Sequence, residues 1–184
     1  MLTETPLQKT AITICGSLRK DALNEHLRRH MSMKLREAGV AVTDLDLHDF
    51  QMPIFDQDIE DAGKTPEAAV RLAELFRTND IVLIISPEYN GSIPGVLKLM
   101  FDISDYKKVW WGKKALLTGV ATGRGGNLRG LEHLTSILHY LRVVVHPNKL
   151  PISLVHNLMN ETGVVQDAGT LKAIEAQIEE FIQF

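Results

Sequence analysis

The sequence predicts an α/β fold in which a five-stranded parallel sheet of order 2-1-3-4-5 is covered by helices on both faces, a doubly wound arrangement. Three observations support this prediction. Segments with the pattern of strands alternate with amphipathic helical segments along the 184 residues. The central strand segments are apolar throughout, as expected of strands buried on both faces. Glycine-rich or polar loops follow three of the strands.

The composition is that of one globular domain, which we expect to span residues 1–184. The chain is 45% apolar and 23% charged, and its net charge of −3 gives no general attraction to nucleic acid or to anionic membranes. No apolar run approaches the ~20 residues of a membrane-spanning helix, and residues 1–10 lack the apolar core of a signal peptide. We therefore expect a cytoplasmic protein that binds neither nucleic acid nor membrane.

The predicted sheet begins with two strands and the helix that joins them. Residues 11–15 form an apolar strand that stops at Gly16. Residues 40–47 form a second strand, and the aspartates toward its end indicate an edge position partly in water. An amphipathic helix is predicted over residues 22–38, where apolar side chains recur every three or four positions at Leu23, Leu27, Met31, Leu35 and Ala38.

A third strand and two further helices are predicted around the centre of the chain. After an irregular segment, Pro66 suits the first turn of a helix whose apolar face carries Val70, Ala73 and Phe76. Residues 81–85 form the most strand-like run of the sequence. Pro94 and Gly95 then begin a helix over residues 96–103, which is apolar on most of its circumference. Because one sheet contact cannot cover such a helix, we expect it at the interface of a homodimer or homotetramer.

The last third of the chain continues the alternation. A polar and aromatic segment contains Trp110 and Trp111, which fit either a local core or an exposed rim at an interface or substrate mouth. Residues 115–120 form the fourth strand and residues 143–145 the fifth, which ends at Pro147. Two helices are predicted from apolar stripes, one with Leu128, Leu131, Leu134, Leu138 and Leu141, the other with Leu171, Ile174, Ile178 and Ile182.

The segment between the first strand and the first helix carries the first chemical motif, Gly16-Ser17-Leu18-Arg19-Lys20-Asp21-Ala22-Leu23-Asn24. Its hydroxyl, guanidinium and amide groups would gather at a helix N-terminus, where free N–H groups and the helix dipole favour an anion. A phosphate group would fit there. The alternative is a plain glycine turn, with Asp21 as the N-cap and Arg19 in solvent.

The loop after the third strand, residues 86–95, carries the second motif. It offers a tyrosine ring, a side-chain amide, a carboxylate and backbone exposed by Gly91, which suit a flat aromatic ligand with a polar edge. The alternative is a plain turn set by Pro87 and Gly91. In the predicted sheet the loops after the first and third strands flank the topological switch point, so both motifs would face one crevice. A phosphate joined to a planar ring describes a mononucleotide with a large aromatic head, and FMN is the candidate.

At these residues the sequence resembles the NAD(P)H-dependent FMN reductase family of flavodoxin-like quinone, azo-dye and chromate reductases. The family pattern Pro-Glu-Tyr-Asn-x-Ser-x-Pro-Gly-x-Leu-Lys matches residues 87–98, and Gly-Ser-x-Arg-x-x-Ser-x-Asn matches Gly16, Ser17, Arg19 and Asn24. The similarity extends over nearly the whole chain. It implies a flavodoxin-like fold, bound FMN, NADPH or NADH as co-substrate, and a small-molecule electron acceptor such as a quinone, an azo compound, chromate or free flavin.

The resemblance also implies the residues of the site. The FMN phosphate would be held by Ser17, Arg19 and Asn24. The flavin ring would be held by Pro87, Glu88, Tyr89, Asn90, Gly91 and Ser92, and its other edge would be bordered by Gly123, Gly125 and Gly126. No catalytic acid or base is required, because the flavin supplies the redox chemistry. No metal site is predicted, because His26 and His30 lack an evident third ligand.

The sequence departs from the family pattern at three positions. Ala22 replaces the second serine of the phosphate loop, and a lost neutral hydrogen bond costs ~0.5–1.5 kcal/mol, so we expect weaker FMN binding rather than none. Leu99 and Ile103 replace an asparagine and a tryptophan on a helix that faces a partner subunit in the family. The alternative function is a flavodoxin-like electron carrier or a flavin-binding regulatory module without nicotinamide turnover.

Overall fold

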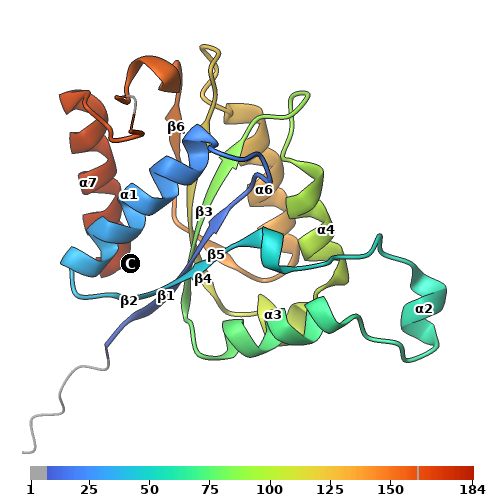
Figure 1. Ribbon diagram of the computed structural model, residues 1–184. Helices are drawn as coiled ribbons and strands as arrows, with labels where there is room; N and C mark the ends of the chain where they lie inside the picture. Colours follow the sequence, from blue (N-terminus) through green and yellow to red (C-terminus); the bar gives the residue numbers. More distant parts are fainter. Residues whose placement is uncertain (1–7, 161) are drawn as a thin grey trace, which may run out of the picture.

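A parallel sheet forms the centre of the computed structural model, which describes residues 8–160 and 162–184 (Figure 1). The strand order is β2-β1-β3-β4-β5, with β6 also paired to β4. The predicted fold class and the order 2-1-3-4-5 are confirmed. The strands are β1 (Thr10–Cys15), β2 (Ala41–Leu45), β3 (Ile81–Pro87), β4 (Lys114–Val120), β5 (Val144–Val145) and β6 (Leu150–Ile152).

The fifth position of the sheet is shared by two short strands, where the sequence predicted one over residues 143–145. Strand β5 pairs with the beginning of β4 and strand β6 with its end. Pro147 lies between the two and has no N–H group, so it interrupts the ladder. Strand β6 escaped prediction because Pro151 stands in its middle, and a proline argues against a strand unless it lies at a sheet edge.

Helices cover both faces of the sheet. Helices α1 (Leu23–Glu37) and α7 (Ala168–Gln183) lie on one face, and α3 (Glu67–Arg77), α4 (Gly95–Ile103) and α6 (Leu128–Tyr140) on the other (Figure 1). Side chains of β3 alternate between the two cores: Val82 and Ile84 join α3, α4 and α6, and their neighbours join α1 and α7. Both faces of the strand are therefore buried, which is why it is apolar throughout.

Four short elements were not predicted: a 3₁₀ helix η1 (Leu47–Asp49), α2 (Gln57–Asp61), α5 (Tyr106–Val109) and a 3₁₀ helix η2 (Val155–Asn157). They are too short to show a helical periodicity. Helix α5 leads into the two tryptophans, and the local-core prediction is confirmed for Trp110 alone. Trp110 is fully buried, with its ring centroid 4.7 Å from Phe76 and 4.9 Å from Phe101, whereas Trp111 is 55% exposed.

Helix α4 is better covered within the chain than its sequence suggested. Leu97, Met100, Phe101 and Ile103 are buried, and Val96 and Leu99 pack partly against the same core. The apolar circumference of α4 therefore gives less support to a subunit interface than the sequence indicated. Among residues 8–160 and 162–184, no helix combines the length and the apolar character needed to cross a bilayer.

Candidate active site

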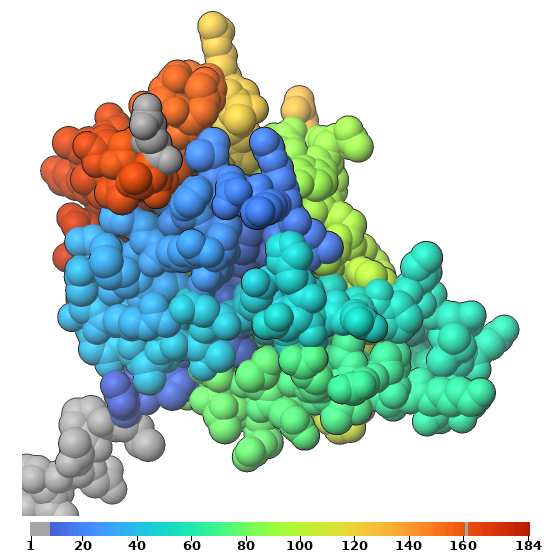
Figure 2. Space-filling model, in the orientation of Figure 1, coloured from blue at the N-terminus to red at the C-terminus, as the bar shows by residue number. Residues whose placement is uncertain are grey.

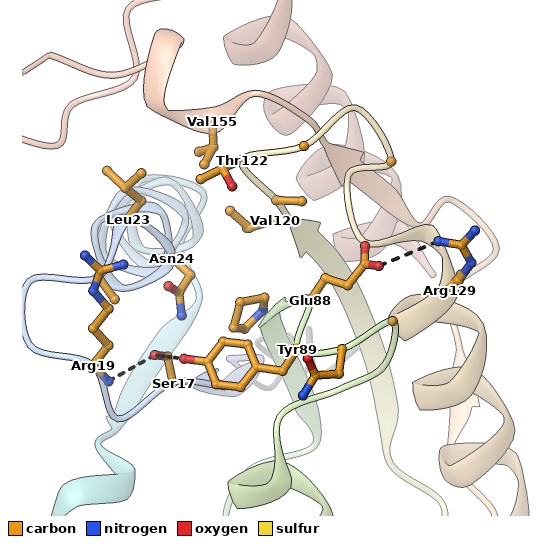
Figure 3. A pocket seen from close by; sticks show the side chains of 17 residues that line it. Ser17, Arg19, Leu23, Asn24, Glu88, Tyr89, Val120, Thr122, Arg129 and Val155 are labelled. Atoms are coloured by element: carbon orange, nitrogen blue, oxygen red, sulfur yellow. Dashed lines mark hydrogen bonds and ion pairs between the residues drawn. The ribbon is translucent and has the colours of Figure 1, made fainter.

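A cavity of about 460 Å³ lies where β1, β3 and β4 end (Figure 3). Pockets of ~300–1,000 Å³ are typical of small-molecule and cofactor sites, and this edge is where doubly wound sheets bind ligands. The loops after these three strands line the cavity, together with the start of α6 and of η2. The lining residues are Ser17, Arg19, Ala22, Leu23, Asn24, Pro87, Glu88, Tyr89, Asn90, Gly91, Val120, Ala121, Thr122, Gly123, Gly125, Arg129 and Val155.

The loop after β1 passes close to helix α4. A β-carbon on Gly16 would lie 2.6 Å from Leu97 Cδ1, so any other residue would have to displace this buried leucine. Ser17 is buried, and its Oγ accepts a hydrogen bond from the backbone N–H of Arg19 at 3.0 Å. The same Oγ lies 3.3 Å from the hydroxyl of Tyr89, so the loops after β1 and β3 meet as their places in the sheet predicted.

Helix α1 begins at the cavity without a side-chain cap. Ala22 occupies the N-cap position and has no atom that could accept a hydrogen bond from the first-turn N–H groups. The alternative with Asp21 as N-cap is therefore wrong, because Asp21 precedes the cap in a left-handed conformation (φ 52°). Ala22, Leu23 and Asn24 line the cavity, so the uncapped end of α1 adjoins it. This end can bind an anion.

The side chain of Asn24 is held in place by Cys15. The Asn24 Nδ2 atom donates a hydrogen bond to Cys15 Sγ at 3.0 Å, and both residues are buried. Burial raises the pKa of the Cys15 thiol to about 12, so it stays protonated at physiological pH. Cys15 is therefore a buried packing residue that supports the amide of Asn24.

The loop after β3 is closed by a tight turn over residues 89–92. The backbone N–H of Tyr89 donates to the Ser92 carbonyl at 2.9 Å, and that of Ser92 to the Tyr89 carbonyl at 3.1 Å. Asn90 (φ 52°) and Gly91 (φ 76°) are both left-handed, as an Asn-Gly turn of this type requires. Ser92 lies outside the cavity lining, and its Oγ is 2.8 Å from Nδ1 of His133 on α6. Its contacts fix the shape of the turn.

The loop after β4 packs against β6 and the end of β3. Gly123 and Gly125 line the cavity, whereas Gly126 lies outside the lining and a β-carbon there would be 2.8 Å from Pro151 Cβ. The fully buried Asn127 donates from Nδ2 to the Ser86 carbonyl at 2.7 Å. Asn127 thereby joins this loop to the loop after β3.

A carboxylate and a guanidinium face each other on the side of the cavity opposite Ser17 (Figure 3). Glu88 Oε1 lies 3.8 Å from Arg129 Nη1, and the side chain of Arg129 is 79% exposed. Arg129 comes from the first turn of α6, so the cavity has a cation at each side, Arg19 and Arg129. Within the described parts of the chain, no group of three or more His, Cys, Asp or Glu side chains is placed to hold a metal ion.

The model of a family described as NADPH-dependent FMN reductase matches residues 10–157. The chain belongs to this family. A quinone reductase of Escherichia coli (strain K12) is 32% identical over 180 residues, which cover 94% of this chain and 93% of the relative. An NAD(P)H-dependent FMN reductase of Pseudomonas aeruginosa is 30% identical over 90% of this chain and 89% of its own. The predicted family, the enzymatic activity and the cofactor FMN with NADPH or NADH as co-substrate are confirmed.

Among solved structures, this chain is similar to FerB, described as a flavoenzyme NAD(P)H:(acceptor) oxidoreductase of Paracoccus denitrificans. The TM-score is 0.79 at 28% identity, and the match covers 95% of this chain and 96% of FerB. An azoreductase AzrA has the same fold, with a TM-score of 0.62 at 17% identity. The FMN reductase fold therefore extends over almost the whole chain.

The residues of this FMN reductase fit FMN at both ends of the cavity. The uncapped N-terminus of α1 and the guanidinium of Arg19, which forms no ion pair with any described residue, suit a phosphate. At the other end, Tyr89 and the apolar Val120 and Val155 suit a flat ring, while Gly123 adds no side chain that would occupy the space. The hydrogen-bond donors at one end of the cavity and the room for a ring at the other therefore fit FMN, the cofactor of the family.

Sequence reasoning missed part of the lining. Leu23 was placed on the stripe that faces the sheet, but it is half-buried and lines the cavity. Val120 ends β4, and Ala121 and Thr122 follow it at the same sheet edge as the two motifs, so their position could have identified them. Nothing in the sequence beyond its place in a predicted helix indicated that Arg129 lines the cavity. Val155 could not be placed, because it follows strand β6, which was not predicted.

Proposed function

We propose that this FMN reductase uses NADPH or NADH to reduce quinones, with azo compounds, chromate and free flavin as further acceptors. In the net reaction, a hydride from the nicotinamide and a proton from solvent convert a quinone to a hydroquinone. The observation that carries the proposal is one cavity that joins an anion-binding helix N-terminus to a slot for a flat ring. Relatives named quinone reductase and 2-hydroxy-1,4-benzoquinone reductase support the choice of acceptor.

At one end of the cavity, Ser17, Arg19 and Asn24 would hold the FMN phosphate, together with the first-turn N–H groups of α1. Arg19 supplies a positive charge and a fork of donors that match phosphate oxygens. Ser17 is fixed by its contacts to Tyr89 and to the Arg19 backbone, and Asn24 by Cys15. These contacts orient the donors before a ligand arrives, which lowers the entropic cost of binding.

At the other end, the loop after β3 would hold the ring through Pro87, Glu88, Tyr89, Asn90 and Gly91, with Ser92 fixing the turn. Gly123 and Gly125 would border the other edge, and Gly126 would set the path of their loop. FMN, when bound, supplies the two-electron redox chemistry between nicotinamide and acceptor. The protein supplies binding and orientation. We propose no catalytic side chain, and Glu88 remains a pocket residue opposite Arg129.

The test is reduction by nicotinamide in a stopped-flow experiment without oxygen. We expect NADPH or NADH to bleach the flavin absorbance of the loaded protein, and a quinone to restore it. Gly123→Leu should slow bleaching, because a β-carbon at Gly123 meets nothing within 4 Å and the side chain would extend into open space beside the cavity lining. If dithionite bleaches the flavin but neither nicotinamide does so within minutes, the protein is an electron carrier or a flavin-binding module.

The remaining parts of the proposal concern assembly and location. We propose a homodimer or homotetramer in the cytoplasm, with residues 1–184 folded as one domain. Support for association comes from a groove of about 800 Å³ between residues 53–66, α3 and the start of α5. Figure 2 shows residues 53–66 projecting from the body. Helix α2 in this segment has no buried residue, and Ile54 is 85% exposed.

A further inference from the structure

We propose that His48 is a positioning residue for the loop of residues 17–22, here termed the phosphate loop, and that only its doubly protonated form holds this loop in place. The inference rests on the proposed phosphate site at Ser17, Arg19 and Asn24. His48 lies in η1 and does not line the cavity. It acts through the backbone of the loop and not on the ligand.

Both ring nitrogens of His48 face hydrogen-bond acceptors. Nε2 lies 2.9 Å from the carbonyl oxygen of Leu18, and Nδ1 lies 2.7 Å from Oδ1 of Asp46. A carbonyl oxygen and an ionised carboxylate can only accept, whereas a neutral imidazole has a single N–H to donate. The two contacts are satisfied together only by the imidazolium form. Asp46 also accepts the backbone N–H of His48 at 2.9 Å, which favours the ionised carboxylate.

Few other contacts could hold the phosphate loop if the hydrogen bond between His48 and the Leu18 carbonyl were lost. Within residues 8–160 and 162–184, it is the one hydrogen bond that ties residues 18–21 to another element. Arg19 follows Leu18 directly, and Asp21 holds the unfavourable left-handed conformation. When His48 loses a proton, one of its two bonds is lost. Because the Asp46 carboxylate retains the remaining N–H, the bond to Leu18 is the one released, and the backbone that carries Arg19 becomes free to move.

The charges around His48 favour its protonation. The hydrogen bond to Asp46 raises the pKa of His48, the bond to the Leu18 carbonyl raises it further, and Asp49 adds to the effect. Because the pKa is raised in the folded protein, the contact is present at low pH and is lost as the pH rises through that value. The charged groups on His48's own segment and on the neighbouring elements include Asp46, Asp49, Arg28, Arg19, Lys20, Asp21 and Arg71 of α3, which donates to the Asp49 carbonyl at 2.8 Å.

The experiment compares FMN with riboflavin, which lacks the phosphate, by fluorescence titration between about pH 5.5 and 9, below and above an ordinary histidine pKa. The variant is His48→Gln. We expect it to weaken FMN about tenfold at the low end, the effect of one charge-assisted hydrogen bond, and to have little effect at the high end. Riboflavin should bind both proteins equally. The ratio of the FMN dissociation constants of variant and wild type cancels the titration of the FMN phosphate, because that titration is common to both proteins.

Two further variants separate titration from a merely structural role. Asp46→Asn keeps the His48 ring but removes the charge, so the pH at which FMN affinity falls should shift downward. His139→Gln changes an exposed histidine on α6 outside the lining and should change nothing. Two results would overturn the proposal if the wild-type protein prefers FMN over riboflavin. One is a variant-to-wild-type ratio of FMN dissociation constants that does not vary with pH, and the other is an equal loss of riboflavin affinity in the variant. Wild-type protein without a preference for FMN over riboflavin would instead overturn the phosphate site, and this inference with it.

Discussion

Gly130 and Asn127 fit together so closely that a β-carbon on the glycine would lie 2.0 Å from Oδ1 of the asparagine. Asn127 is left-handed (φ 66°), and its amide reaches the Ser86 carbonyl. Helix α6 therefore needs a glycine one turn after its N-cap so that this side chain can join the loops after β3 and β4.

Gly130→Ala is expected to destabilise the protein, although alanine in a helix interior is favoured over glycine by ~1 kcal/mol. The added methyl group must displace Asn127, so the loops at the ring end lose their connection. FMN and riboflavin should weaken equally. Urea denaturation and fluorescence titration measure both effects. Gly95→Ala is the control, because a β-carbon at Gly95 meets nothing within 4 Å. A stabilised Gly130→Ala protein would contradict the role of Asn127.

Arg19→Ala should weaken FMN much more than riboflavin. A guanidinium–phosphate contact is charge-assisted and worth ~1.5–3 kcal/mol, and it is absent when the ligand has no phosphate. Fluorescence titration of both ligands measures the difference. Arg29→Ala is the control, because Arg29 is exposed on α1, pairs with Glu25 and lies outside the lining. Equal losses for the two ligands would refute the assignment of Arg19.

Ala22→Ser places a hydroxyl group at the N-cap of α1. A serine cap stabilises a helix by ~0.5–2 kcal/mol relative to alanine, so the melting temperature without FMN should rise. FMN should bind up to about tenfold more tightly if the hydroxyl also reaches the phosphate. Calorimetry and titration separate the two effects. A raised melting temperature with unchanged FMN affinity would show that the hydroxyl caps the helix alone.

Acid should remove a stabilising contribution of Asp44 on β2. Burial alone would raise its pKa, but hydrogen bonds from three side chains and the charge of Arg28 outweigh burial and hold the pKa at about 2. Since this pKa is below the ordinary value, the contribution is present above about pH 4 and is lost as the pH falls toward 2. Urea midpoints of wild type and Asp44→Asn should therefore converge in acid. A difference that is constant with pH would contradict this. Those three side chains are Arg36, Thr13 and Ser32, and Arg28 Nη1 donates a fourth hydrogen bond to Asp44 Oδ1.

Ile54→Glu should shift the protein toward monomer. Ile54 is 85% exposed beside the groove of residues 53–66, and a charge there opposes burial against another subunit. Tyr140→Glu is the matched control, because Tyr140 is 84% exposed on α6 and does not line this groove. Sedimentation at several concentrations measures the effect. An oligomer that persists unchanged in Ile54→Glu would exclude this surface.

The convergence of the site could be predicted because it follows from topology. Residues 81–85 are apolar at every position, which places β3 between two helical layers next to β1. The strand order then brings Ser17 and Tyr89 together across 72 positions of sequence. The sequence motifs identified these two residues, and the order of the strands in the sheet explains why they lie close together.

The rest depended on contacts that no local pattern records. Gly126 was predicted to border the ligand, but β6 packs against it, and β6 was hidden by Pro151. His48 had no periodic or motif signal, since its role comes from the fold of the loop over η1. Asp44 was read as a solvated edge residue, yet Arg28 reaches it from a buried position on α1. Such tertiary pairings become visible only when the elements are placed.

The division of the outer strand into β5 and β6 bears on how copies of this enzyme can meet. A long regular edge strand exposes a row of N–H and C=O groups to which another chain can add, a route to aggregation. Here one edge is broken at Pro147 and carries Pro151, and the opposite edge carries the ion pairs of Asp44. Neither edge offers an uninterrupted template. If copies associate as proposed, we therefore expect the contact to be made by side chains and not by a sheet that continues from one molecule into the next.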